Sequence, residues 1–223
     1  MLIGLGYKKQ VGKDTVAQLL CDMYDFKRLS FAGPLKELVQ IIVRVDIVEG
    51  SMFTQTEYEA QLNAWVQKYW GHDVYEHGVY TNILKPRVWC KGFAEVETGR
   101  YRKLLQWLGT DVFRDTVDTN FWVKAMARNM HKGLGQSFVI TDMRFPNEKN
   151  FVEDMGGFAV EVKRAVVGVD EHISENALTS ADWKYTIDNN GSKMALLEQI
   201  QDLMECVYDD YFDRTGIRRQ PQN

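Results

Sequence analysis

Short apolar runs alternate with longer stretches of helical period along most of this chain. Five short runs are either apolar throughout or alternate apolar with polar side chains, a pattern typical of β-strands. They cover residues 2–5, 26–31, 137–141, 158–162 and 184–187. Between most of them, apolar residues recur every three or four positions, which predicts amphipathic helices at about 16–20, 35–42, 57–69, 101–112, 121–130 and 194–203.

Capping signals add detail to this pattern. Pro146-Asn147-Glu148 predicts the start of a further helix directly after the third strand. Ser192 is expected to cap the last helix, and Asp118 or Thr119 the helix at 121–130.

The alternation of strands with helices predicts an α/β fold class, with a mainly parallel five-stranded sheet covered by helices on both faces. Ligands bind such sheets beyond the carboxyl ends of the strands. The loop after Leu5, the turn at 30–33, residues 142–147 and residues 163–164 all follow strand ends. Residues 46–100 have a helical period at 57–69 and otherwise no clear period, so we interpret this region as a largely helical insertion.

The first strand leads through a short loop into the first helix. Unpaired N–H groups and the positive end of the helix dipole make such a helix start attractive to anions, and Lys13 would add a mobile positive charge. The usual phosphate-loop pattern has a glycine where Tyr7 stands here, with Gly6 one residue before it. Asp14 takes the place of the usual magnesium-binding hydroxyl, and Thr15 follows. The segment predicts a phosphate-binding loop; the alternative is an ordinary strand-to-helix turn with a surface lysine.

Charged residues at two other strand ends suit the same chemistry. Asp142 ends an apolar strand, where a carboxylate would suit magnesium, which prefers oxygen ligands. Arg144 and Arg164 would offset negative charge on a phosphoryl group during its transfer. The alternatives are a turn-forming aspartate and solvated arginines. The segment 164–175 is long enough to close over a bound ligand and keep water out.

One face of the helix predicted at 101–112 suggests a second site. Arg102, Gln106, Thr110 and nearby Arg114 follow one another at spacings of four. Arginine suits a monophosphate, and an amide suits a base or sugar. The alternative is the solvent face of an amphipathic helix.

Composition narrows the class of protein. With 223 residues, 45% hydrophobic side chains and a formal charge of −4, the chain fits one globular domain better than a dedicated nucleic-acid binder, which usually carries a basic patch. No apolar run approaches the roughly 20 residues that cross a bilayer, so we expect a cytoplasmic protein. Cys21, Cys90 and Cys206 lack the spacing of a zinc site or of a disulfide framework.

Six motifs follow one another along the chain: GKDT at 12–15, SFAGPLK at 30–36, LQWLGTD at 105–111 with Arg114, WV at 122–123, ITDMRFPNE at 140–148 and HISE at 172–175. As a set, in this order, they resemble the phage-type deoxynucleoside monophosphate kinases, a branch of the P-loop nucleoside-monophosphate kinase superfamily. The resemblance implies a P-loop NTPase three-layer sandwich over residues 1–223. It also implies an acceptor-side insertion at about 46–100 and a lid at about 164–183.

The same resemblance implies an activity. ATP, with Mg²⁺ as cofactor, would phosphorylate a 2′-deoxynucleoside 5′-monophosphate, with no nucleic acid or membrane as partner. Two alternatives remain: a kinase for another small acceptor, such as dephospho-coenzyme A, and a nucleotide-dependent switch without catalysis. The insertion would suit either a homodimer interface or a wall of the acceptor site. A chain encoded by a phage would work in the host cytoplasm.

Roles of individual residues are implied as well. Those expected at ATP are Lys9, Val11, Gly12, Lys13, Asp14, Thr15 and Asn190, the last in a turn at 189–192 that resembles an adenine-contacting loop. Those expected at the acceptor are Phe31, Lys36, Arg102, Gln106, Thr110, Arg114, Trp122, His172 and Glu175. The implied catalytic set is Lys13, Asp142, Arg144 and Arg164, and the implied metal ligands are Asp14 and Asp142.

Overall fold

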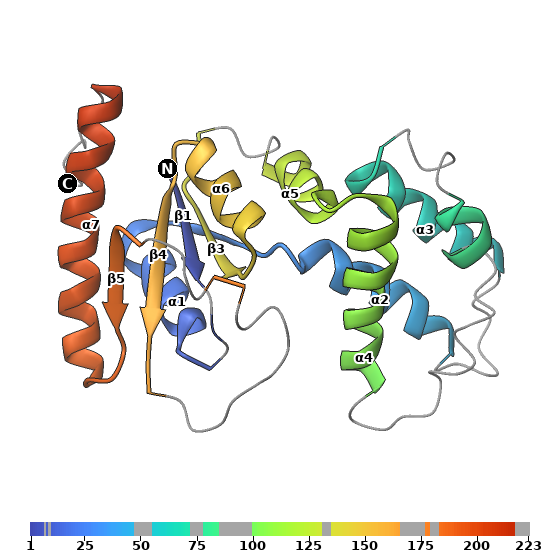
Figure 1. Ribbon diagram of the computed structural model, residues 1–223, viewed down its shortest axis with the longest axis horizontal. Helices are drawn as coiled ribbons and strands as arrows, with labels where there is room; N and C mark the ends of the chain where they lie inside the picture. The colour runs from blue at the N-terminus through green and yellow to red at the C-terminus, as the bar shows by residue number, and fades with distance from the viewer. Residues whose placement is uncertain are drawn as a thin grey trace. The chain divides into compact units, whose positions relative to one another are not determined.

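The computed structural model of this chain describes residues 1–216 apart from 7, 9, 47–54, 72–77, 85–99, 131–134, 166–176 and 179–182. Its helices and strands form two compact units (Figure 1). The first unit comprises Met1–Ser30 together with Gly135–Asn223, and the second comprises Phe31–Leu134. The insertion predicted at about 46–100 lies inside the second unit, which begins before it and continues after it.

The described part of the first unit contains a sheet of five parallel strands (Figure 1): β1 (Leu2–Gly6), β2 (Lys27–Leu29), β3 (Phe138–Met143), β4 (Phe158–Lys163) and β5 (Tyr185–Asp188). Their order in the sheet is β2-β3-β1-β4-β5. β1 lies between β3 and β4 and is buried along its whole length, as its continuous apolar run predicts. The α/β fold class and the parallel sheet expected from the sequence are confirmed.

Helices cover both faces of this sheet. α1 (Lys13–Tyr24) and α7 (Lys193–Thr215) pack against one face, because Ile3 of β1 belongs to the same buried cluster as Leu20 and Ile200. α6 (Pro146–Asp154) covers the other face. A Cβ on Gly4, which would point opposite to the side chain of Ile3, would lie only 2.9 Å from Val152 Cγ2 of α6. Helix, sheet and helix therefore form the three expected layers.

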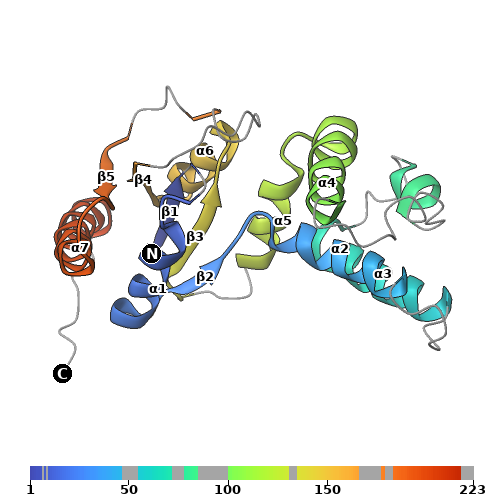
Figure 2. The ribbon, with the colours of Figure 1, turned by 90° about the horizontal axis from the view of Figure 1, so that it is seen from below.

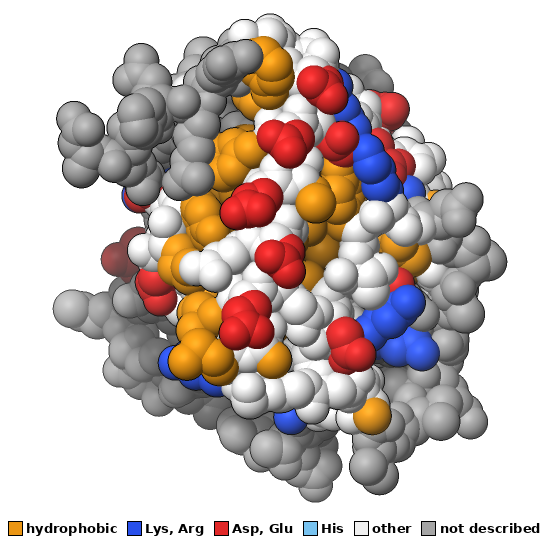
Figure 3. Space-filling model, turned by 90° about the vertical axis from the view of Figure 1, so that its left-hand side faces the viewer, with side chains coloured by type: hydrophobic (Ala, Val, Ile, Leu, Met, Phe, Trp, Pro, Cys, Tyr) orange, Lys and Arg blue, Asp and Glu red, His pale blue; other side chains and the backbone are white. Residues whose placement is uncertain are grey.

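α7 shows how the helical period sorts side chains between core and solvent. It begins after Ser192, whose hydroxyl accepts a hydrogen bond from the Ala195 N–H at 3.2 Å, so the predicted cap is confirmed. Its inner side is buried against the sheet. Its outer side carries a row of exposed acidic side chains (Figure 3): Glu198, Asp202, Glu205, Asp209 and Asp213. Their spacing of three and four places them on one solvent face.

The described part of the second unit is helical (Figure 2): α2 (Gly33–Asp46), α3 (Gln55–Tyr69), η2 (Tyr80–Leu84), α4 (Arg100–Gln106), η4 (Trp107–Val117) and α5 (Phe121–Met130). Its core is rich in aromatic rings, including those of Trp65, Tyr69, Trp70, Phe113, Phe121 and Trp122. The ring centroids of Phe113 and Phe121 lie 4.5 Å apart, and those of Trp65 and Phe113 lie 5.8 Å apart. These contacts join α3, η4 and α5 around one centre.

The helix predicted at 101–112 changes its winding and extends further than expected. α4 ends at Gln106 and continues directly as a π-helix, η4, to Val117. Leu108 and Gly109 are buried, then Val112 and Phe113, and Val117 is half-buried. Buried positions thus recur every four to five residues. That interval matches the wide turn of a π-helix better than the 3.6-residue turn of an α-helix.

Candidate active site

The carboxyl ends of the strands bring together residues that are far apart in the sequence. In the register of the sheet, Gly6 pairs with Met143 of β3 and with Glu161 of β4. Further along, Lys163 of β4 pairs with Asp188 of β5. The loop that follows β1 therefore shares one edge with the residues that follow β3, β4 and β5, which is the edge where ligands bind parallel sheets.

The loop between β1 and α1 has an unusual backbone. Gln10 and Gly12 adopt left-handed conformations, with φ of 61° and 93°. The Gly12 carbonyl then accepts hydrogen bonds from the N–H groups of Thr15 and Val16, at 3.0 and 3.1 Å, which close the first turn of α1. Lys13 is only 7% exposed, and its ammonium donates a hydrogen bond back to the Lys8 carbonyl. The ammonium therefore lies against the loop instead of extending into solvent.

Asp142 is held by a serine from the neighbouring strand. Leu29 of β2 pairs with Ile140 of β3, so Ser30, one residue past the end of β2, lies beside the end of β3. Its hydroxyl donates a hydrogen bond to Asp142 Oδ2 at 2.6 Å, a short distance typical of a bond to a carboxylate. Sequence reasoning missed Ser30, although its place at a predicted strand end was a usable signal.

The two carboxylates expected at a metal have different partners. The carboxylate of Asp142 is half-buried and bound by a hydroxyl, whereas that of Asp14 is exposed and paired with the Arg28 guanidinium. Mg²⁺ takes oxygen ligands and, beside nucleotide phosphates, needs only one or two carboxylates from the protein. The donor set at the end of β3 fits such an ion.

Arg144 follows β3 on a rigid backbone. Glu148, 3% exposed in the first turn of α6, accepts hydrogen bonds from the N–H groups of Arg144 and Phe145 at 2.8 and 3.1 Å. Together with Pro146 at the helix start, this cap confirms the helix predicted from 146. The backbone that carries Arg144 is therefore fixed relative to α6.

The end of β4 meets the turn after β5. Arg164 is exposed, and the next residue, Ala165, donates its N–H to Asn190 Oδ1 at 2.7 Å. The side chain of Asn190 thus ties this turn to the chain that carries Arg164. Its predicted contact with ATP stays a prediction, as do the roles of the other site residues. Lys9, His172 and Glu175 lie outside the described residues, as does most of the predicted lid.

The expected acceptor-side row lies on α4 and η4 of the second unit. Arg102 is exposed, and Gln106, Thr110 and Arg114 are half-buried. Residues four apart drift by about 40° per step around an α-helix. In the wider π-helix the same step falls short of a full turn, so the drift runs the other way and partly cancels. The change of winding at Gln106 therefore keeps these four side chains closer to one line than a continuous α-helix would.

Three further acceptor-side candidates lie elsewhere in the second unit. Lys36 is exposed in the first turn of α2. Phe31 and Trp122 are 2% and 4% exposed. The indole N–H of Trp122 donates to the Gly109 carbonyl at 2.8 Å, a bond that holds α5 against η4. Burial thus gives Phe31 and Trp122 a part in the core, and their contact with an acceptor stays a prediction.

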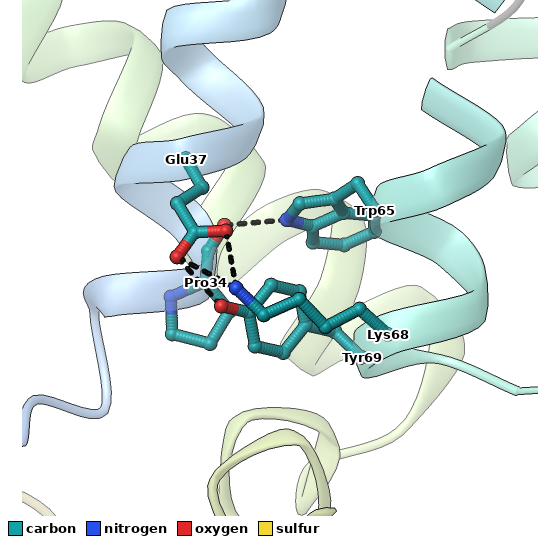
Figure 4. A network of polar contacts seen from close by, with 5 residues as sticks. All are labelled: Pro34, Glu37, Trp65, Lys68 and Tyr69. Atoms are coloured by element: carbon teal, nitrogen blue, oxygen red, sulfur yellow. Dashed lines mark hydrogen bonds and ion pairs between the residues drawn. The ribbon is translucent and has the colours of Figure 1, made fainter. Parts of the chain in front are cut away.

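A polar network that sequence reasoning missed fastens α2 to α3 (Figure 4). The Glu37 carboxylate accepts a hydrogen bond from the Tyr69 hydroxyl at 2.6 Å and lies 3.0 Å from the Lys68 ammonium. Beside it, the Trp65 indole N–H donates to the Pro34 carbonyl at 2.7 Å. Burial, reinforced by the bond to Glu37, raises the pKa of Tyr69 to about 12. Burial alone would lower the pKa of Lys68, but its hydrogen bonds with Tyr69 and Glu37 outweigh that effect and raise it.

Two properties of the described residues bear on the expected partners. Among these residues, no three His, Cys, Asp or Glu side chains are grouped as they would be around a metal held by protein alone. In the same part of the chain, no helix combines the length and the apolar character needed to span a membrane.

Comparison with known proteins identifies relatives of this chain. A family model described as deoxynucleotide monophosphate kinase matches residues 91–200, which include η4, β3 and the residues that follow them. A deoxynucleoside-5′-monophosphate kinase of Escherichia phage T5 is 29% identical over 184 residues, which are 69% of this chain and 72% of the phage protein.

Two other relatives align over nearly the full length. A putative deoxynucleotide monophosphate kinase of Acanthamoeba polyphaga mimivirus is 28% identical over 224 residues, covering 93% of this chain and 96% of the viral protein. A deoxynucleotide monophosphate kinase of Enterobacteria phage T4 is 23% identical over 239 residues, covering 92% of this chain and 99% of the phage protein. The family model begins at residue 91 and therefore does not include the loop before α1.

Proposed function

We propose that this chain, which is similar to proteins described as deoxynucleotide monophosphate kinases, transfers the terminal phosphoryl group of ATP to a 2′-deoxynucleoside 5′-monophosphate. The observation that carries the proposal is the buried Lys13 at the start of α1, wrapped by the loop after β1 at the same sheet edge as Asp142 and Arg144. Lysine, helix start and carboxylate are the parts that phosphoryl transfer requires.

The triphosphate of ATP would bind at the start of α1. Backbone N–H groups of the first turn and the positive end of the helix dipole favour an anion there. Lys13 would exchange its hydrogen bond with the Lys8 carbonyl for the outer phosphates, and the Thr15 hydroxyl would contact an inner phosphate. The exposed Asp14 and Thr15 leave this turn open to a ligand of that size.

Asp142 would hold Mg²⁺ through water or directly, with Asp14 as a second carboxylate. When bound, the ion offsets negative charge on the phosphates. The Ser30 hydroxyl fixes the carboxylate that would receive it.

The acceptor would bind along the row on α4 and η4. Arg102 and Arg114 suit its phosphate, Gln106 and Thr110 suit its base or sugar, and Lys36 of α2 adds positive charge. An oxygen of the acceptor phosphate attacks the terminal phosphorus of ATP, the bond from that phosphorus to the bridging oxygen breaks, and ADP and a deoxynucleoside diphosphate leave. No nucleophilic side chain is needed, and Arg144 and Arg164 would offset charge on the group in transfer.

A coupled assay of ADP formation tests the proposal, with the four deoxynucleoside monophosphates, their ribose counterparts and dephospho-coenzyme A as acceptors. We expect ADP formation that depends on a deoxynucleoside monophosphate. Lys13→Ala should lower kcat/KM by at least about 100-fold while the protein stays folded, because the Lys13 ammonium would stabilise negative charge that develops in the transition state.

Lys27→Ala is the matched control, since Lys27 lies at the amino end of β2 and its exposed ion pair with Asp25 is long, at 3.5 Å. It should retain full activity. ATP binding without acceptor-dependent turnover would make the chain a nucleotide switch, and turnover with dephospho-coenzyme A alone would assign another acceptor.

A further inference from the structure

The turn between β5 and α7 is held rigidly by hydrogen bonds. It begins at Asp188, the last residue of β5, continues through Asn189 and Asn190, and is called here the 188–190 turn. The side-chain amide of Gln199 in α7 makes two hydrogen bonds with the backbone of Asp188. Its Oε1 accepts from the Asp188 N–H, and its Nε2 donates to the Asp188 carbonyl, each at 2.8 Å. The Asn189 N–H donates to the Lys163 carbonyl at 2.7 Å. The Asp188 carboxylate accepts from the N–H and the side-chain amide of Asn190, at 3.0 and 2.5 Å.

From this fixed turn, one side chain reaches the loop before α1. Asn189 Nδ2 donates a hydrogen bond to the Val11 carbonyl at 2.8 Å. The peptide between Val11 and Gly12 is planar, and in the usual trans form its carbonyl and its N–H point in opposite directions. Holding the carbonyl on Asn189 therefore turns the Gly12 N–H away from Asn189. The side chain of Val11 is 1% exposed, which anchors the same peptide from the core.

Gly12 is matched to this contact. A Cβ at position 12 would overlap the Asn189 amide nitrogen and would lie 3.3 Å from its Cγ. The φ of 93° independently disfavours any residue with a side chain. Glycine at this position thus serves the left-handed backbone and also leaves room for the amide that holds the loop.

We propose that Asn189 is a positioning residue of the nucleotide site, which holds the Val11–Gly12 peptide so that the Gly12 N–H is presented to a bound phosphate. The identity of that ligand as a nucleoside triphosphate rests on the proposed function. In this account, Asn189 acts through the backbone and touches neither the base nor the phosphates. It also links the phosphate loop to the end of β4, because the same turn binds the Lys163 carbonyl and, through Asn190, the Ala165 N–H.

The test removes the amide donor of Asn189 in two ways. Asn189→Asp places a carboxylate oxygen against the Val11 carbonyl, and Asn189→Ser shortens the side chain without charge. Both should raise the dissociation constant for ATP, measured by calorimetry without acceptor, by about tenfold or more. The KM for ATP should rise in parallel, and the KM for the deoxynucleoside monophosphate should change less than about twofold.

Gln18→Ala is the matched control, because it also removes a side-chain amide from the first unit, where the Gln18 amide donates to the exposed Asp22 at 2.8 Å. Gln18→Ala should leave the dissociation constant and the KM for ATP unchanged. A wild-type dissociation constant for ATP in Asn189→Asp and Asn189→Ser would overturn the proposal. So would equal rises in KM for both substrates, since a general loss of structure predicts those.

A double-mutant cycle separates positioning from stability. Gly12→Ala weakens ATP binding by straining the backbone and by displacing Asn189, and the second effect is absent once Asn189 is serine. Each single substitution should raise the dissociation constant for ATP. The product of the two fold-changes should therefore exceed the fold-change measured for the double variant. Fully multiplicative effects would contradict the proposal. Absence of acceptor-dependent ADP formation in the wild type would instead refute the proposed function, while the ATP-binding comparison would still test Asn189.

Discussion

Removing the Tyr69 hydroxyl tests the network that fastens α2 to α3. Tyr69 is 1% exposed, and its hydroxyl donates to Glu37 Oε1 at 2.6 Å. A hydrogen bond to a charged group contributes about 1.5–3 kcal/mol. Glu37 keeps Lys68 at 3.0 Å, and 47% of its side chain is exposed, so the lower end applies. Tyr69→Phe should lower the free energy of unfolding by about 1.5 kcal/mol at pH 7.

The same hydroxyl makes this loss depend on pH. Burial and the bond to Glu37 raise the pKa of Tyr69 from 10 to about 12 in the folded protein. Because the pKa of Tyr69 is higher in the folded than in the unfolded protein, the stabilising effect of the protonated hydroxyl is complete below pH 10 and is lost as pH rises toward 12. At pH 11 the contribution of the Tyr69 hydroxyl to stability is smaller than at pH 7 by about 1.4 kcal/mol. Lys68, whose pKa is also raised, contributes with the same sign, and its ion pair with Glu37 is present in both proteins.

Urea unfolding followed by circular dichroism, at pH 7 and pH 11, measures the effect. The difference in stability between wild type and Tyr69→Phe should shrink from about 1.5 kcal/mol to near zero. Trp65→Phe is the control, because it removes the neighbouring donor to the Pro34 carbonyl without a titrating group, and its loss should be equal at both pH values. A Tyr69→Phe difference that is zero at pH 7, or the same at pH 11 as at pH 7, would refute the reasoning.

Two further substitutions probe the sheet edge. Gly6→Ala should destabilise the protein by about 1–3 kcal/mol in urea, because a Cβ there would overlap the Trp183 indole, whose Cζ3 and Cζ2 would lie 3.1 and 3.2 Å away. Wild-type stability of this variant would rule out that packing. Ser30→Ala should raise the Mg²⁺ concentration at half-maximal ATP turnover several-fold, and weaken Mn²⁺ binding seen by electron paramagnetic resonance, since Asp142 loses its 2.6 Å donor. Unchanged metal midpoints would show that Ser30 does not support the metal site.

The sheet was predictable from the sequence because its strands carry strong local signals. β1 and β3 are short apolar runs buried on both faces, and each is followed by a polar loop. Ser192 and Pro146 marked helix starts through local chemistry that the structure confirms. The placement of the loop after β1 and of Asp142 at one edge followed from the rule for parallel sheets and needed no knowledge of side-chain contacts.

What was missed depends on contacts across the fold. Asn189 and Val11 are 178 residues apart, so nothing near Gly12 in the sequence reveals why the glycine is needed there. Ser30 lies next to Asp142 only because β2 pairs with β3. The π-helix at 107–117 fits apolar positions four to five apart, an interval that also occurs on an α-helical face. Tertiary packing, not local preference, selects the wider turn.

The central claim is that one phosphoryl group passes from ATP to the acceptor phosphate on this chain. Incubation with ATP labelled in its terminal phosphate, a deoxynucleoside monophosphate and Mg²⁺ tests it most directly, with the products separated by chromatography. The account predicts that the label appears in the deoxynucleoside diphosphate, and that Lys13→Ala abolishes its appearance. Label released only as inorganic phosphate, or retained in ATP by the folded wild-type protein, would contradict it.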